Sequence, residues 1–236
     1  MPPPIDPGYR SPTLIEPIEV SVYILKAGFS VATPDAREGM GFIIGEHHIL
    51  TCAHVVASAL GASGDLKGRR VSFSYSPLNL RSTVVEATVE GYWPRDDSAR
   101  KGDPPSDVAL LRVVDANWTH PYDSVIAPWG VGVAYDMGVR GYGISDTVRS
   151  GRDFQGPVSG EGAGMRWRIS SHADPNRKIV PGCSGGAVWV GTRVIGMVTS
   201  FQQEEVGLFI PAEFLVAQPE IRAVWTDGGG DRKSVV

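Results

Sequence analysis

The chain has 236 residues, of which 42% are hydrophobic, so it is long enough to enclose a sizeable apolar core. Its 22 lysine and arginine side chains against 26 acidic ones leave a formal net charge of −4, and no basic block stands out. Nucleic acid is therefore excluded as the default partner, because proteins that bind it cluster their cations against the phosphates. No apolar run reaches the roughly 18–20 residues that a membrane-spanning helix needs, so no membrane partner is expected.

Two features of the chain favour a reducing compartment. Cys52 and Cys183 are its only cysteines, and two cysteines cannot build the disulfide framework typical of small secreted proteins. Residues 1–10 lack the basic and apolar regions of a secretory signal. The expected location is therefore cytoplasmic.

Beyond a proline-rich arm at residues 1–17, the apolar runs are short and bounded by Gly, Pro, Asp and Asn, which is typical of strands. A first series of candidate strands covers residues 19–26, 39–45, 71–75, 83–92 and 107–114. A second series covers residues 137–144, 154–158, 165–170, 186–190, 194–200 and 206–210. Residues 115–135 between the two series suit a crossover segment.

Helical patterns occur only at residues 53–60 and 212–224, and Pro219 interrupts the second. The glycine-rich residues 227–233 predict a flexible tail or the start of a linker. Two sets of about six strands without helices between them favour two β-barrels or sandwiches over an α/β sheet.

Three segments carry the residue types of nucleophilic catalysis. Residues 39–56 predict a buried hairpin whose second strand leads into a helical turn that bears His54. Asp107 stands at the mouth of an apolar strand, and Ser184 lies in a glycine-lined turn that leads into another strand. Asp103 competes with Asp107 as the acid, but it lies in a Gly-Asp-Pro-Pro turn.

These residue types belong together for a chemical reason. A serine hydroxyl attacks a carbonyl only with a base in reach, and a neutral imidazole suits that role near neutral pH. A buried carboxylate holds the imidazole in the correct tautomer and stabilises the imidazolium. Two N–H donors must then bind the oxyanion, and glycine beside the nucleophile lets backbone N–H groups do so.

Thr-Cys-Ala-His54, Asp107-Val-Ala-Leu-Leu and Gly182-Cys-Ser184-Gly-Gly, in this order, resemble the three signatures of the trypsin-like serine peptidases. Residues 206–211 resemble the final strand of the intracellular-type and HtrA-type branches. The resemblance implies an all-β fold of two six-stranded antiparallel β-barrels, with the active site between them and a short C-terminal helix. The implied boundaries are an arm at 1–17, barrels at 18–120 and 121–215, and a terminal helix and tail at 216–236.

The resemblance also implies a role for each site residue. Ser184 would be the nucleophile, His54 the general base and acid, and Asp107 the orienting acid. The N–H groups of Gly182 and Ser184 would form the oxyanion hole. Thr199 would lie beside Asp107, and the substrate strand would be lined by Thr199, Ser200 and Phe201. Lys178 lies near the place of the acid that basic-residue-cleaving trypsins carry, so cleavage after lysine or arginine is disfavoured, and Phe201 favours small aliphatic side chains.

The chain departs from the pattern at Cys183, where zymogen-activated members of the family place an acid. Activation by a newly cut N-terminus is therefore not expected, and control by loop ordering, a regulatory partner or a fused domain takes its place. Cys183 could itself be the nucleophile, as in some viral relatives, but in those the cysteine is followed directly by glycine, a place that Ser184 holds here. Its other interpretation, a small packing residue, is favoured.

The sequence thus predicts a serine endopeptidase that acts on protein or peptide substrates with no metal ion and no cofactor. Its protease segments resemble modules found in bacterial signalling and defence systems. The alternative is a catalytically silent double-barrel module that binds partner proteins. An esterase is disfavoured, because the chain lacks the Gly-x-Ser-x-Gly elbow between a strand and a helix.

Overall fold

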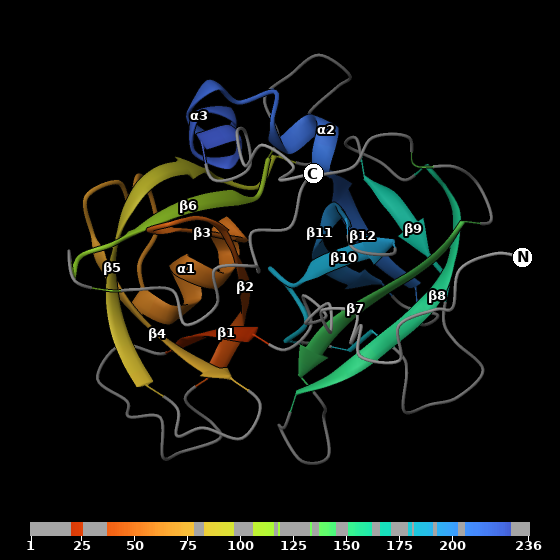
Figure 1. Cartoon of the computed structure of the whole chain (residues 1–236), viewed down its shortest axis with the longest axis horizontal. Helices are drawn as coiled ribbons and strands as arrows, with labels where there is room; N and C mark the ends of the chain where they lie inside the picture. Colours follow the sequence, from red (N-terminus) through yellow and green to blue (C-terminus); the bar gives the residue numbers. More distant parts are fainter. Residues whose placement is uncertain are drawn as a thin grey trace, which may run out of the picture.

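A computed structural model describes most of the residues that bear on these predictions. The described residues are 20–25, 37–77, 83–96, 106–115, 118, 133, 137–144, 151–161, 166–170, 179–180, 182–190, 193–202 and 206–227. The arm at 1–17, most of the crossover at 115–135 and the tail after residue 227 lie outside them. The described residues form two closed antiparallel β-barrels that lie side by side (Figure 1), which confirms the predicted fold class.

The first barrel is built from the N-terminal strands, in the order β1-β2-β3-β6-β5-β4, and β1 pairs with β4 to close it. Its strands are β1 (Val20–Leu25), β2 (Arg37–Gly45), β3 (His48–Thr51), β4 (Arg70–Pro77), β5 (Thr83–Trp93) and β6 (Val108–Val113). Each candidate strand of the first series lies within a few residues of one of these. Closure explains the pattern, because every strand turns one face into the barrel interior. The hydrophobic core built around this barrel includes large buried side chains such as Phe73, Ile49 and Leu50.

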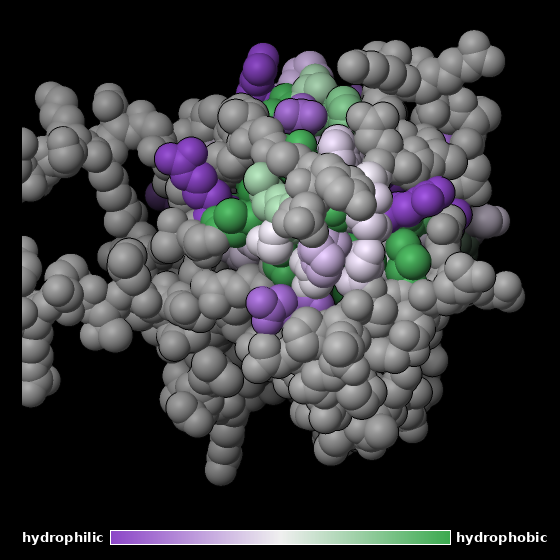
Figure 2. Space-filling model, turned by 90° about the vertical axis from the view of Figure 1, so that its right-hand side faces the viewer, coloured by the Kyte–Doolittle hydropathy of each residue, from purple (hydrophilic) through white to green (hydrophobic). Residues whose placement is uncertain are grey.

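The second barrel has the strand order β10-β11-β12-β9-β8-β7, and β10 pairs with β7 to close it. Its strands are β7 (Gly138–Ile144), β8 (Gly151–Glu161), β9 (Trp167–Ile169), β10 (Ala187–Val190), β11 (Arg193–Gln202) and β12 (Val206–Pro211). The interior includes Phe154, Phe209 and Cys183. On the face of this barrel shown in Figure 2, hydrophilic and apolar described residues are interspersed rather than gathered into one patch.

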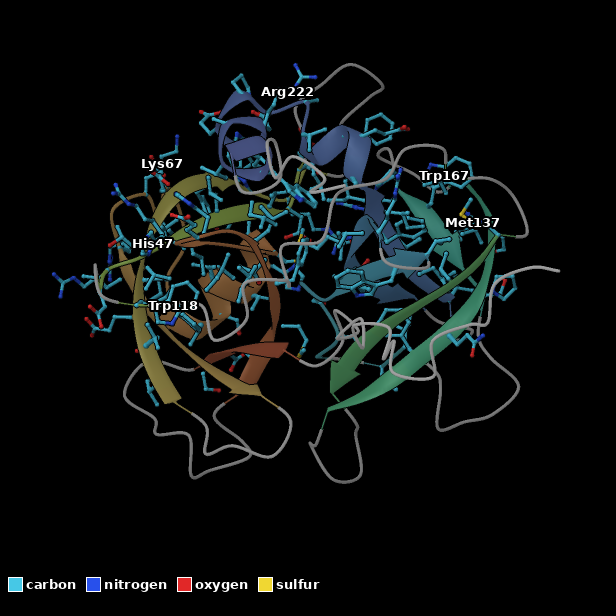
Figure 3. All side chains as sticks on the ribbon, in the orientation of Figure 1. His47, Lys67, Trp118, Met137, Trp167 and Arg222 are labelled. Carbon is cyan, nitrogen blue, oxygen red and sulfur yellow. The ribbon has the colours of Figure 1, made fainter. Side chains whose placement is uncertain are left out.

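Helix α1 (Ala53–Leu60) has the bounds that the sequence predicted. Ala53, Val55, Val56 and Ala59 are buried, so the helix packs on the first barrel through one face. It ends at Gly61, whose φ of 57° is a left-handed cap that glycine adopts without strain. Farther around the barrel, Trp118 packs edge-on against Phe73 and lies beside His47 (Figure 3).

The C-terminal end forms two helices rather than the single short helix expected. Helix α2 (Ala212–Leu215) follows β12, and Pro219 begins helix α3 (Pro219–Asp227) instead of only interrupting a longer one. Proline is favoured in the first turn of a helix, because its missing N–H has no partner there in any case. Helix α3 packs on β2 of the first barrel, with the Trp225 and Phe42 ring centroids 5.9 Å apart (Figure 1). Helices α2 and α3 therefore lead from the second barrel back to the first.

The core of the first barrel extends into these terminal elements, since Leu215, Ile221 and Trp225 belong to it. This packing joins β12 of one barrel to the surface of the other. Among the described residues, no helix has the length and apolar character needed to cross a membrane.

Candidate active site

The three predicted triad residues come from three separate elements on the two barrels. His54 is the second residue of α1, and Asp107 immediately precedes β6, so the first barrel supplies both. Ser184 lies in the turn before β10 of the second barrel. The site is therefore assembled by the packing of one barrel against the other.

His54 and Asp107 form a tight pair. Nδ1 of His54 donates to Asp107, with Oδ1 at 2.9 Å and Oδ2 at 2.8 Å, and the backbone N–H of His54 also donates to Oδ1 at 3.0 Å. The Asp107 side chain is completely buried, whereas the His54 side chain is 39% exposed. Because Asp107 occupies Nδ1, the other ring nitrogen, Nε2, is left for proton exchange.

Asp107 holds an unusual backbone conformation. Its φ is 69°, which makes it the one non-glycine residue with positive φ in the described part of the chain. Its N–H donates to the carbonyl of Pro94 at 3.3 Å. Aspartate adopts this left-handed region more readily than most residues, and the bend aims the carboxylate at the N-terminal turn of α1.

Ser184 lies in the second of two overlapping β-turns. In the first turn the N–H of Cys183 donates a hydrogen bond to the carbonyl of Val180, at 3.1 Å. In the second turn the N–H of Gly186 donates to the carbonyl of Cys183, at 3.0 Å. The third residue of each turn is a glycine with positive φ, 96° at Gly182 and 88° at Gly185. A turn of this kind needs glycine there, because a side chain would clash with the backbone.

The turns leave two donors available. Within the described residues, the N–H groups of Gly182 and Ser184 donate to no other protein group. They are the two groups that the sequence predicted for an oxyanion hole, and unoccupied donors are what such a hole requires.

The Ser184 hydroxyl does not bond to His54. Its Oγ donates to the carbonyl of Thr199 at 3.1 Å, and no hydrogen bond joins it to the His54 ring in the described structure. Thr199 is the extra residue of a β-bulge in β11, since Val198 pairs with Phe209 and Ser200 pairs with the adjacent Leu208 of β12. The bulge frees the Thr199 carbonyl to face the nucleophile, as bulges beside active sites commonly do.

The Thr199 side chain has a partner of its own in the second barrel. Its buried hydroxyl donates to the carbonyl of Leu208 at 3.4 Å, across the bulge, and makes no hydrogen bond with Asp107. At the bulge, the backbone carbonyl of Thr199 is the group that bonds to Ser184 of the predicted triad, and the placement of Thr199 beside Asp107 stays a prediction. Ser200 and Phe201 follow in β11, and Lys178 lies outside the described residues.

Hydrogen bonds that the sequence did not predict hold the two barrels together beside Ser184. The N–H of Met40 in β2 donates to the Ser184 carbonyl at 2.8 Å, and the Thr51 hydroxyl donates to the Met40 carbonyl at 2.6 Å. The Cys52 thiol donates to the carbonyl of Val198 in β11 at 3.2 Å. The turn that carries Ser184 is thus bonded directly to β2, whose hairpin partner β3 leads to His54.

A buried arginine of the second barrel also contacts the segment that carries Asp107. Arg166, just before β9, is 3% exposed, and its Nη2 donates to the Ser106 hydroxyl at 3.4 Å. Ser106 in turn donates to the carbonyl of Asp96 at 3.0 Å. No local sequence signal pointed to Arg166, because its contact lies 60 positions away.

Replacing Gly185 by alanine is expected to damage both fold and site. A Cβ at Gly185 would lie 2.0 Å from the Met40 carbonyl oxygen and 2.6 Å from the Thr51 hydroxyl, and the φ of 88° already disfavours a side chain. We expect a loss of about 2–5 kcal/mol in the free energy of unfolding, from overpacking and backbone strain together. Chemical denaturation of the purified variant measures it.

Gly64→Ala is the matched control. Gly64 has a φ of 91°, but nothing lies within 4 Å of a Cβ there. This variant therefore has the backbone strain of a positive φ without a steric clash. We expect it to lose only about 1 kcal/mol. Equal losses for the two variants would show that the close approach between the barrels is not tight.

Cys52, His54 and Asp107 bring a sulfur, a nitrogen and an oxygen within 4.8 Å of one another, which are zinc-ligand types. The geometry does not favour a metal, since Nδ1 of His54 and the carboxylate are already bonded to each other. Burial first, and then the charge of Asp107, also raise the pKa of the Cys52 thiol well above its usual value, so sulfur keeps its proton.

A cavity of about 490 Å³ opens beside His54. It lies between the end of α1, the loop that follows it and the end of β5, and its lining includes Ala57, Ala62, Asp65, Lys67, Tyr92, Pro94 and Arg95. Burial, then the carboxylates of Asp107 and Asp65, raise the pKa of the Tyr92 phenol, so the ring stays neutral at physiological pH. The surface of the cavity is mainly apolar, and the charged side chains of Asp65, Lys67 and Arg95 also line it.

A family model described as a trypsin-like peptidase domain matches residues 39–197, which is more than half of the chain. The chain belongs to the trypsin-like peptidase family. This confirms the resemblance drawn from the three segments. No curated protein matches the chain.

Two solved structures have a fold similar to that of this trypsin-like peptidase. The serine endoprotease from Yersinia pestis superposes with a TM-score of 0.57 at 21% sequence identity, over 90% of this chain and 65% of that one. The active form of the Rv3671c protease from M. tuberculosis gives a TM-score of 0.54 at 18% identity, over 94% and 84%. The chain therefore spans less than two thirds of the Yersinia protein, and at these identities the likeness concerns the fold.

Proposed function

We propose that this chain cleaves peptide bonds through an acyl-enzyme at Ser184. The observation that carries the proposal is the pairing of a fully buried Asp107 with the backbone N–H and the ring Nδ1–H of His54. This pairing supports a base held in one tautomer. The unoccupied N–H groups of Gly182 and Ser184 support an oxyanion hole beside it. A protein or peptide is the substrate class that family membership implies.

The reaction begins with a rotation of the serine. The Ser184 hydroxyl leaves the Thr199 carbonyl and turns toward Nε2 of His54, a rearrangement about one side-chain bond that substrate binding can drive. As Oγ attacks the scissile carbonyl, His54 takes its proton and Asp107 stabilises the imidazolium. The N–H groups of Gly182 and Ser184 bind the oxyanion.

The tetrahedral intermediate then collapses. The C–N bond breaks, the amine leaves with the proton from His54, and the acyl group stays on Ser184 as an ester. Water enters, gives a proton to His54 and attacks the ester carbonyl. Collapse of the second intermediate returns the proton to Ser184 and releases the carboxylic acid.

The free edge of β11 is the proposed place for the substrate backbone. Strand β10 pairs with β11 only as far as Met197, and within the described residues no strand pairs with that edge at Ser200 and Phe201. An extended peptide can add itself there as a further strand. The roles of Phe201 in favouring small aliphatic side chains and of Lys178 in disfavouring basic ones stay predictions of the same proposal.

The cavity beside His54 is proposed to hold a substrate side chain close to the scissile bond. Its walls of Ala57, Ala62, Pro94 and the neutral Tyr92 ring suit an apolar or aromatic side chain. We expect Tyr92→Ala to lower kcat/KM about 10-fold for peptides with such a residue and much less for peptides with glycine there. Paired peptide substrates measured with both proteins test this, and an equal loss on both peptides would contradict it.

Control of the activity is proposed not to involve a new N-terminus. Cys183 is 1% exposed in the core of the second barrel, and no carboxylate stands at that position to receive an amino group. Regulation then falls to loop ordering, a partner protein or a fused domain, in a cytoplasmic signalling or defence setting that the two unbridged cysteines suit. Activity of a chain shown by intact mass to be unprocessed supports this, and activity only after N-terminal cleavage contradicts it.

Digestion of an unbiased peptide library tests the proposed function, with new N-termini identified by mass spectrometry and the Ser184→Ala variant as the blank. Cleavage by the parent protein alone is the expected result. The alternative, a silent module that binds partner proteins, draws support from the Ser184 hydroxyl, which bonds to Thr199 instead of His54. That alternative predicts no cleavage by either protein.

A further inference from the structure

The Cys52 thiol joins the two halves of the candidate site at one point. Cys52 precedes α1, lies two residues before His54 and is completely buried. It makes no capping bond to its own helix; instead its Sγ–H donates to the carbonyl of Val198, 146 positions along the chain and in the other barrel. The bond therefore connects the segment that carries His54 to strand β11.

The acceptor is shared with the nucleophile turn. The Val198 carbonyl also accepts the N–H of Gly185, at 2.7 Å, and the next carbonyl of the strand, that of Thr199, accepts the Ser184 hydroxyl. Two successive carbonyls of β11 thus receive donors from the segments of the base and the nucleophile. A shift of Cys52 relative to Val198 would change how His54 stands relative to Ser184.

The state of the thiol suits a donor role. Its pKa is raised well above the usual value, by burial first and by the nearby Asp107 second, so the sulfur keeps its proton at physiological pH. A thiolate here would be an acceptor facing an acceptor and would repel Asp107. Cys52 is also unbridged, so the proton is not lost to a disulfide.

We propose that Cys52 is a positioning residue, whose thiol holds the turn bearing His54 against the Val198 carbonyl and so sets the distance over which His54 and Ser184 exchange a proton. The inference rests on the proposed function for its effect on rate. Proton transfer needs heavy atoms within about 3 Å, and a misplacement of about 1 Å can lower a rate 100-fold.

A matched pair of variants tests the thiol. Cys52→Ser keeps a donor of similar size, whereas Cys52→Ala removes the sulfur and with it both the donor and the volume that it fills. Cys183→Ala is the control for loss of a buried thiol elsewhere, since Cys183 is equally buried but lies in the core of the second barrel.

The kinetic test measures kcat and KM on one cleaved peptide, together with the rate of labelling by a fluorophosphonate probe. We expect Cys52→Ala to lower kcat and the labelling rate about 10- to 100-fold with little change in KM, and Cys52→Ser to restore both to within about 3-fold of the parent protein. Equal rates for Cys52→Ala and the parent, or an equal fall for the alanine and serine variants, would overturn the proposal.

A second readout does not depend on activity. In the Cys183→Ala background the infrared S–H stretch reports Cys52 alone, and a hydrogen-bonded thiol absorbs at lower wavenumber than a free one. We expect the band of the folded protein to lie below that of a simple alkanethiol in a hydrocarbon solvent, and an unshifted band overturns the proposal whether or not the protein is an active peptidase. A shifted band without any labelling would instead locate the failure in the proposed function.

Discussion

Replacing Ser184 by alanine is expected to lower kcat/KM by about 10⁵- to 10⁶-fold on any peptide that the parent protein cleaves. The variant loses the only atom that forms the acyl-enzyme, while the backbone N–H of residue 184 and the turn remain. The lost hydrogen bond goes to the Thr199 carbonyl, and the side chain is half-buried, so the fold should persist. Product formation by the purified variant, followed by mass spectrometry, measures the loss.

Cys183→Ala is the matched control for this variant. It removes a neighbouring nucleophilic atom from the same turn, but that side chain is buried in the barrel core and has no role in the proposed chemistry. We expect it to keep most of the activity and to lose some stability. If Cys183→Ala were inactive and Ser184→Ala active, the cysteine would be the nucleophile.

Replacing Asp107 by asparagine is expected to lower kcat/KM by about 10⁴-fold with the fold intact. Asparagine is nearly isosteric and tolerates the φ of 69°, so the backbone can stay where it is. The carboxylate, however, accepts both the backbone N–H and Nδ1–H of His54. An amide presents an NH₂ to one of those donors, which favours the wrong tautomer of His54 and leaves the imidazolium without a counter-charge.

The measurement is a comparison of kcat/KM and of circular dichroism for the parent protein and Asp107→Asn. Asp115→Asn is a matched control with the same change of charge, because Asp115 is an exposed residue just beyond the far end of β6. We expect that variant to leave kcat/KM unchanged. Full activity of folded Asp107→Asn would remove Asp107 from the mechanism.

Local patterns in the sequence predicted most of the fold. Short apolar runs bounded by Gly and Pro located the strands within a few residues, because a closed barrel buries one face of every strand. The helical pattern at residues 53–60 matches the observed bounds of α1. The helical pattern predicts Pro219 only as an interruption, whereas it starts α3, since proline breaks a helix in its interior but suits its first turn.

The details of the candidate site depend on contacts between distant residues. His54 and Asp107 were predicted and do lie together, 53 positions apart. The bulge at Thr199 depends on the pairing of β11 with β12, and the Thr199 hydroxyl there bonds to the Leu208 carbonyl. The bond from Cys52 to Val198 spans 146 positions and the two barrels, and nothing in the residues around either one signals it.

The most direct measurement of the central claim is the mass of the protein after reaction with a fluorophosphonate probe, followed by peptide mapping of the adduct. The account predicts one adduct per chain, on the peptide that contains Ser184, formed by the parent protein and by Cys183→Ala but not by Ser184→Ala. The pairing of His54 with Asp107 is what should make this serine react while the others in the chain stay inert. No adduct under conditions where the protein is folded, or an adduct on Cys183, would contradict it.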